Sequence, residues 1–175
     1  MSDNWRIVAL VVWKRPYPAI AYPHIASIRL SKRMRIILEV SEWIQQCGGW
    51  AFLFVGDILH KVKALTAKRY AKSHAWRIAL SDVLGRIFRE VRKRELYPLE
   101  TIYADSEFQH YSSIVMDIFQ AKVYIGKYSE ILPADVLAYA MHAGKLSKHN
   151  KIIIISEKQQ SSCLLYTSPS PRDRG

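Results

Sequence analysis

Short apolar runs that alternate with longer segments of helical pattern most constrain how this chain can fold. The runs rich in branched or aromatic side chains predict strands over residues 5–13, 50–57, 99–105, 121–126 and 151–155. The segments between them predict helices over about residues 31–47, within 66–95, 107–119 and 133–144. Alternation of this kind is typical of α/β proteins, so we expect a mixed sheet flanked by helices.

Several boundaries of these segments have local causes. Ser31 and Ser106 are residue types that cap the start of a helix, and Pro133 suits a first helical turn. Gly48 is expected to end the first helix. Within the longest segment, apolar residues between Trp76 and Val91 recur at i, i+3, i+4 and i+7, which predicts one apolar stripe.

Composition restricts the class of protein. Half of the residues are hydrophobic (50%) and 23% are charged, which fits one globular domain that we place at residues 1–162. The longest apolar run, residues 7–13, is far shorter than the ~20 residues of a membrane span. Without a secretory leader pattern, a cytoplasmic protein with no membrane partner is the default expectation. Cys47 and Cys163 have no metal-type spacing, and nothing supports a disulfide between them.

Positive charge is concentrated in one part of the chain, whose formal net charge is +11. Between Lys61 and Arg94 there are eleven Lys or Arg residues against only Asp82 and Glu90. Such clustering is typical of a surface that binds the phosphates of nucleic acid, although a solvated helix face is an equal alternative. The candidate phosphate contacts are Lys61, Lys68, Arg69, Lys72, Arg86, Arg89 and Lys93.

Three aspartates lie where α/β proteins often place functional groups, at strand ends and helix starts. Asp57 and Asp105 follow predicted strands, and Asp135 opens a predicted helix. Converging carboxylates could hold Mg²⁺ or Mn²⁺ and support phosphodiester displacement. The structural alternatives are a cap for Asp105, a dipole partner for Asp135 and a simple strand end for Asp57. The histidines show no zinc spacing, and the chain has no phosphate-binding glycine loop and no Gly-x-Ser-x-Gly elbow.

Three stretches within residues 24–145 carry a resemblance: "HIASIRLSKRMRIILEVSEWI", "FLFVGDILHKVKALTAKRYAKSHAWRIALSDVLGRIFREV", and "LETIYADSE" followed by "ILPADVLAYAMHAG". Together they resemble a family of uncharacterised proteins with a ribonuclease-H-like fold, the domain of unknown function numbered thirty-eight hundred. The resemblance implies that Asp105 and Asp135 are catalytic carboxylates of a metal site. It matches Asp57 and Lys61 less closely.

The chain also departs from that family. Nothing before residues 5–13 matches the Asp-Glu-Ser-Gly strand with which the family opens. The segment "AYPHIAS" lacks the acidic residue ahead of the first helix, and Leu132 replaces a glutamine that precedes the Ala-Asp pair. The resemblance therefore implies a ribonuclease-H-like fold that is incomplete at its N-terminus, in a fragment or degenerate copy that is inactive as an enzyme.

The end of the chain reads differently from the rest. Residues 163–173, "CLLYTSPSPRD", resemble the translation of one reading frame of a transposase-type adapter used in DNA library preparation. We therefore expect residues 163–175 to be a non-native, disordered tail and exclude them from the domain.

Three functions follow as hypotheses. The first is metal-dependent nucleic-acid processing by a ribonuclease-H-like protein, with Asp105 and Asp135 at the site. The second is a non-catalytic basic module that binds nucleic acid or a protein partner. The third, a small nuclease of the PIN type, predicts four clustered acids, and only three candidates are visible.

Overall fold

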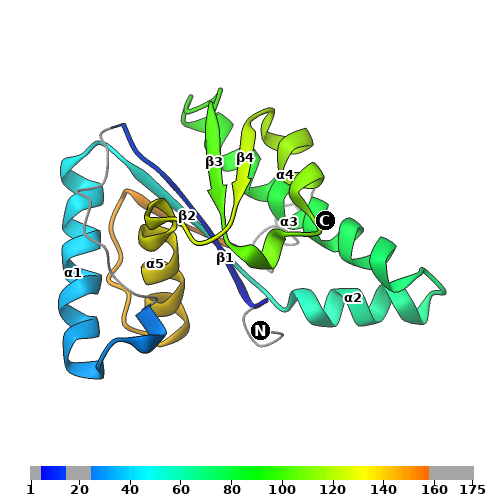
Figure 1. Cartoon of the computed structure of the whole chain (residues 1–175), viewed down its shortest axis with the longest axis horizontal. Coiled ribbons are helices and arrows are strands. Elements are labelled where there is room, and N and C mark those ends of the chain that lie inside the picture. The colour runs from blue at the N-terminus through cyan, green and yellow to red at the C-terminus, as the bar shows by residue number, and fades with distance from the viewer. Residues whose placement is uncertain (1–4, 15–24, 158–175) are drawn as a thin grey trace, which may run out of the picture.

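A computed structural model describes residues 5–14 and 25–157 of the chain. The predicted non-native tail lies outside these residues. Two sheets form within the described part (Figure 1). One consists of strands β1 (Ile7–Val12), β2 (Trp50–Val55) and β5 (Ile152–Ser156), in the order β1-β2-β5. The other pairs β3 (Thr101–Ala104) with β4 (Lys122–Ile125).

Both directions of pairing occur in the three-stranded sheet. Strand β2 pairs antiparallel with β1, so that Val8 lies opposite Phe54. It pairs parallel with β5, with Leu53 opposite Ile154. Strands β3 and β4 are parallel. The predicted mixed α/β architecture, a mixed sheet flanked by helices, is therefore confirmed.

Strand β2 is the centre of the core because its alternating side chains serve both faces of the sheet. Phe52 and Phe54 pack with helix α3 (Lys72–Lys93) on one face. Ala51 and Leu53 pack with α1 (Leu30–Gln46) and α5 (Leu132–His142) on the other. All four side chains are fully buried. Helices therefore cover both faces of this sheet, as Figure 1 shows.

The remaining helices link these layers. Helix α2 (Ile58–Ala67) follows β2 and packs against α3, and α4 (Ser112–Phe119) packs between α3 and β4. Three short 3-10 turns complete the described chain: η2 (Ile25–Ser27), η3 (Ser106–Phe108) and η4 (Ser129–Ile131). No helix in the described ranges combines the length and the apolar character that crossing a membrane requires.

The predicted elements all occur, but two boundaries were wrong and one helix was missed. Helix α1 begins at Leu30 after Arg29, whose extended backbone serves as the N-cap without a side-chain hydrogen bond, so Ser31 is not the cap. The segment expected as one helix over 107–119 is η3 followed by α4, because Asp105 caps the short turn instead. Helix α2 was not predicted.

Candidate functional site

A cleft of about 320 Å³ lies between β1 and β3. Its lining includes residues 5–10, at and just before the start of β1, and residues 102–105, at and just after the end of β3. Leu84 and Ile87 of α3 line it on one side, and Ala134 and Ala138 of α5 on the other. We call this space the β1–β3 cleft. Two of the predicted site residues, Asp105 and Asp135, line it.

Asp105 lies in the cleft lining directly after β3. Its Oδ1 accepts a hydrogen bond from the backbone N–H of Glu107 (3.0 Å) and another from the hydroxyl of Ser106 (3.3 Å). These bonds cap η3, so the structural alternative for Asp105 is confirmed. The same carboxylate still borders the cleft, because a cap occupies only part of its acceptor capacity.

Asp135 lines the same cleft from the first turn of α5. Its Oδ2 accepts a hydrogen bond from the backbone N–H of Ile25 at 3.2 Å, which ties η2 to the helix. Asp105 and Asp135 therefore come together on one cavity from elements far apart in sequence. Glu107 also contributes to the lining.

Asp57 lies outside this cleft. It caps α2, where its Oδ1 accepts from the backbone N–H of His60 at 3.0 Å. It lines a neighbouring hollow that shares Arg6, Ile7 and His142 with the cleft. The fold thus brings two of the three candidate aspartates to one cavity and places the third beside it.

The carboxylates do not form a complete metal site by themselves. Within residues 5–14 and 25–157, no group of three or more His, Cys, Asp or Glu residues is arranged to hold a metal ion. Mg²⁺ takes about six oxygen ligands, and its protein sites usually include carboxylates together with water or substrate. Binding of Mg²⁺ or Mn²⁺ at Asp105 and Asp135 therefore remains a prediction.

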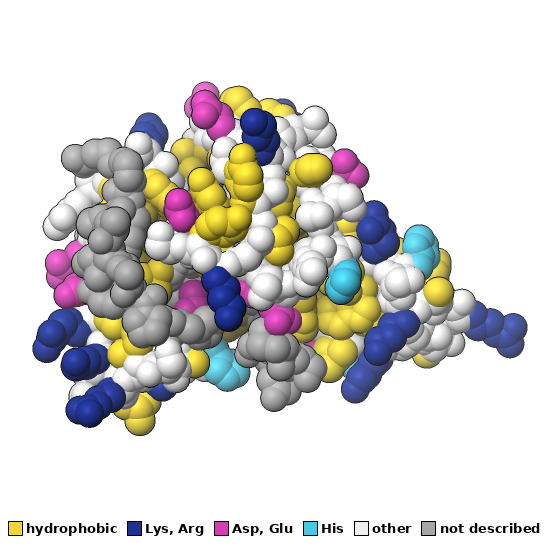
Figure 2. All heavy atoms as spheres, viewed as in Figure 1, with side chains coloured by type: hydrophobic (Ala, Val, Ile, Leu, Met, Phe, Trp, Pro, Cys, Tyr) yellow, Lys and Arg dark blue, Asp and Glu magenta, His cyan; other side chains and the backbone are white. Residues whose placement is uncertain are grey.

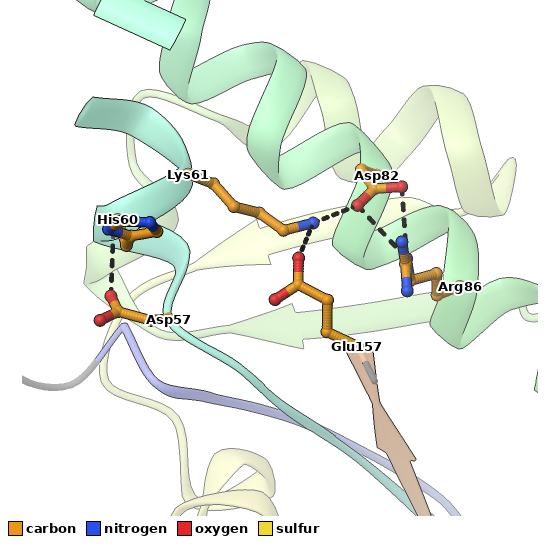
Figure 3. A network of polar contacts seen from close by, with 6 residues as sticks. All are labelled: Asp57, His60, Lys61, Asp82, Arg86 and Glu157. Atoms are coloured by element: carbon orange, nitrogen blue, oxygen red, sulfur yellow. Dashed lines mark hydrogen bonds and ion pairs between the residues drawn. The ribbon is translucent and has the colours of Figure 1, made fainter. Parts of the chain in front are cut away.

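Lys61 is held in an ion-pair network (Figure 3). Its Nζ lies 2.6 Å from Asp82 of α3 and 2.7 Å from Glu157 after β5. Burial of Asp82 acts to raise its pKa, but the hydrogen bond and charge of Lys61, joined by Arg86, hold that pKa below its ordinary value. Lys61 thus joins α2, α3 and the end of β5.

Two more of the predicted phosphate contacts are paired in the same way. The Nε of Arg86 lies 3.3 Å from Asp82, and Lys93 Nζ lies 3.1 Å from Glu90. The remaining candidates are exposed: Lys68, Arg69, Lys72 and Arg89. The described residues place no carboxylate within ion-pair distance of these four. The fold therefore divides the predicted basic segment into paired cations and unpaired ones.

Four unpaired cations gather where α2 turns into α3, whereas Arg89 lies near the other end of α3. Lys63 on α2, Lys68 and Arg69 in the turn, and Lys72 at the start of α3 are all exposed, and we call these four residues the basic tip. The two helices extend away from the sheets in Figure 1, and Figure 2 shows Lys and Arg side chains on this projection. Tyr70, which is 43% exposed, lies within it and packs near the His74 ring (5.6 Å between centroids).

The sequence analysis did not predict helix α2, and it therefore did not predict the helical hairpin that α2 and α3 form. The signal was present: Asp57 is a favoured capping residue, and Ile58, Val62 and Leu65 follow at helical spacing. The pattern covers only ten residues, which is short for a helical signature.

No family model, curated protein or solved structure matches the chain. Membership of the ribonuclease-H-like family therefore stays a prediction, and the function has to be inferred from geometry and charge.

Proposed function

We infer that this protein binds nucleic acid through the basic tip. The observation that supports this function is the exposure of Lys63, Lys68, Arg69 and Lys72 where α2 turns into α3, without an ion-pair partner among the described residues. Unpaired cations of this density attract phosphates and gain affinity by releasing the counterions condensed on the polymer.

The backbone at Arg69 adds a second argument. Arg69 adopts a positive φ of 72° in the turn that closes α2. A left-handed conformation costs a non-glycine residue about 1–2 kcal/mol, and glycine would avoid this cost. Arg69 therefore places a cation in the turn between α2 and α3 at a cost in local stability.

The contacts available at the tip are suited to the backbone of a nucleic acid and not to its sequence. Lysine is a flexible point charge that binds phosphate without reading base edges. The exposed ring of Tyr70 offers a surface on which an unpaired base can stack. We therefore expect binding that is insensitive to sequence, strongly dependent on salt and tighter for single strands than for duplexes of equal length.

The test compares two triple variants of equal charge. One removes Lys68, Arg69 and Lys72 by substitution with Gln, and the matched control replaces Arg29, Lys32 and Arg35, which are exposed on or beside α1. Binding to a labelled single strand is measured between 50 and 200 mM salt. We expect the tip variant to lower the slope of log K against log salt by about 2, and the control to change it much less. Equal losses in both variants would show that net charge, not the tip, drives binding.

A second function is supported by the aspartate pair. Asp105 and Asp135 line one cleft, which is the placement that the predicted metal-dependent nucleic-acid processing requires. Under this proposal the domain is ribonuclease-H-like, and further ligands come from water or substrate.

Titration of Mn²⁺ into the protein tests that proposal. We expect weak binding that is lost in Asp105→Asn and Asp135→Asn but kept in Asp117→Asn, a control on the exposed surface of α4. Equal and negligible binding in all four proteins would remove the metal site and leave the basic tip as the functional surface.

A further inference from the structure

The β1–β3 cleft runs alongside two strand edges, not across the face of a sheet. Consecutive residues line it on both sides, 5–10 at and just before the start of β1 and 102–105 at and just after the end of β3. A cavity over a sheet face would be lined by every second residue, because side chains alternate between faces. The two edges belong to separate sheets, and no strand pairing joins them in the described chain.

The register shows which backbone groups point into the cleft. Arg6 O accepts from Gly56 N at 3.0 Å, so in the antiparallel ladder Val8 and Leu10 also bond toward β2. Ile7 and Ala9 then direct their N–H and C=O groups to the opposite edge, which borders the cleft.

The edge of β3 that borders the cleft also directs backbone N–H and C=O groups into it. Glu100 O accepts from Lys122 N at 3.1 Å and Ala104 O accepts from Gly126 N at 3.0 Å, which directs alternate residues toward β4. The intervening Tyr103 directs its backbone groups into the cleft. Two rows of strong hydrogen-bonding groups therefore face each other across an apolar space.

Apolar side chains from α3 and α5 contribute to both walls of the cleft, whose lining also includes the carboxylates of Asp105, Glu107 and Asp135. Leu84 and Ile87 are buried on the side of α3, and Ala134 and Ala138 form the side of α5. A small apolar ligand would cover these walls but leave both backbone rows without partners. A polypeptide in extended conformation carries N–H and C=O groups along both of its edges and can satisfy both rows at once.

The directions of the two edges also suit a single strand. Trp5, directly before β1, packs against Phe108, just after β3, with 5.5 Å between ring centroids. The start of β1 thus lies beside the end of β3, and these strands run in opposite directions (Figure 1). A strand placed between them can be antiparallel to β1 and parallel to β3.

We propose that the β1–β3 cleft binds an extended, apolar peptide strand from a partner protein other than this chain, which joins the two sheets into one. The resulting order is β4-β3-peptide-β1-β2-β5, with hydrogen bonds that continue both existing ladders. Because helices cover both faces at this place, the strand is a continuous run of apolar residues and not an alternating one. This binding site is separate from the basic tip, but it shares the β1–β3 cleft with Asp105 and Asp135.

Hydrogen exchange of backbone amides tests the proposal with a defined probe. The probe is the peptide acetyl-Lys-Val-Ile-Val-Val-Thr-Lys-amide, added to the full chain. Its matched control has the same side chains but an N-methyl group at every backbone amide, which blocks both edges. We expect the Ile7, Ala9 and Tyr103 amides to exchange at least tenfold more slowly with the probe and unchanged with the control. Val8 and Leu10, already bonded to β2, serve as internal references.

A cleft-filling variant, Ala138→Phe, is expected to abolish this protection while circular dichroism shows the fold retained. Three results would overturn the proposal. They are an absence of protection at the cleft amides, protection confined to the outer edges of β4 or β5, and protection that rises with protein concentration alone. The last would assign the cleft to a second copy of this chain. The N-methylated control keeps the test decisive even if Ala138→Phe fails to fold.

Discussion

At the scale of single residues, Lys61 illustrates how a cation can serve structure instead of ligand binding. Its ammonium group lies between Asp82 and Glu157, and its side chain is only 20% exposed. The sequence indicated a basic segment but could not separate Lys61 from Lys68, because the acidic partner Glu157 is distant in sequence. Side-chain pairing of this kind depends on tertiary contacts that no local pattern contains.

Replacing Lys61 by Met should therefore destabilise the fold without a specific loss at the basic tip. We expect a cost of about 1 kcal/mol, because Asp82 and Glu157, whose side chains are 43% and 37% exposed, lose their common donor. Lys63→Met, at an exposed position on the same helix, should change the free energy of unfolding by less than about 0.5 kcal/mol. Urea unfolding at pH 7 measures both values. Equal effects in the two variants would contradict the network in Figure 3.

His149 is expected to make stability depend on pH. Its Nδ1 accepts from the backbone N–H of Lys151 at 3.0 Å, its Nε2 is buried without a partner among the described residues, and burial lowers its pKa. On acidification, the imidazole of His149 takes up its proton at a higher pH in the unfolded chain than in the folded one. Its contribution to the free energy of unfolding is therefore complete above about pH 6.5 and decreases as the pH falls below that value.

Urea midpoints at pH 7.5 and 5.5 test this prediction in the wild type and in His149→Asn, whose Oδ1 can accept the same hydrogen bond. The loss of stability on acidification should be smaller in the variant. An identical pH dependence in both proteins would show that His149 does not contribute.

At the scale of elements, α3 is the helix whose role was easiest to predict. Its apolar stripe extends over several turns, and Leu80, Val83 and Ile87 of that stripe are fully buried. By contrast, α2 is short, and the boundary of α1 depends on the backbone of Arg29 and not on a capping side chain. A long periodic segment can be recognised even when a few residues depart from its pattern. The prediction of a short element or of a boundary depends on one or two residues.

Shortening a buried side chain in the apolar stripe of α3 should lower the free energy of unfolding. Leu80→Ala is expected to cost about 2–5 kcal/mol, because it removes a fully buried side chain and leaves a cavity against β2. Leu38→Ala on α1 is the control, since that side chain is 53% exposed and should cost little. Chemical denaturation of both variants provides the measurement. A loss at Leu80 no greater than at Leu38 would show that α3 does not pack as described.

At the scale of the whole molecule, the alternation of elements predicted the α/β class but not the division into two sheets. Strand β5 pairs with β2 although about a hundred residues separate them, and β3 pairs only with β4. Pairing between distant strands is decided by packing of the complete core, which local patterns do not report. Of the three aspartates expected to converge from their positions at element ends, Asp105 and Asp135 line the cleft and Asp57 lies beside it, where it caps α2. A cap role was foreseen for Asp105 but not for Asp57.

The tertiary structure also explains why the charge of residues 61–94 alone did not distinguish a binding surface from a solvated helix face. Residues 61–94 carry the cations, but ion pairs on α3 neutralise several of them and leave the exposed group at the α2–α3 turn. The projection of this turn away from the sheets makes it accessible to a large polyanion (Figures 1 and 2).

Protection of lysines from chemical acetylation, followed by mass spectrometry, tests binding at the basic tip most directly. A saturating single-stranded oligonucleotide should slow modification of Lys63, Lys68 and Lys72 several-fold and leave Lys32 and Lys122, exposed elsewhere on the molecule, almost unchanged. Uniform protection of all these lysines, or protection confined to Lys32 and Lys122, would contradict the assignment of nucleic-acid binding to the basic tip.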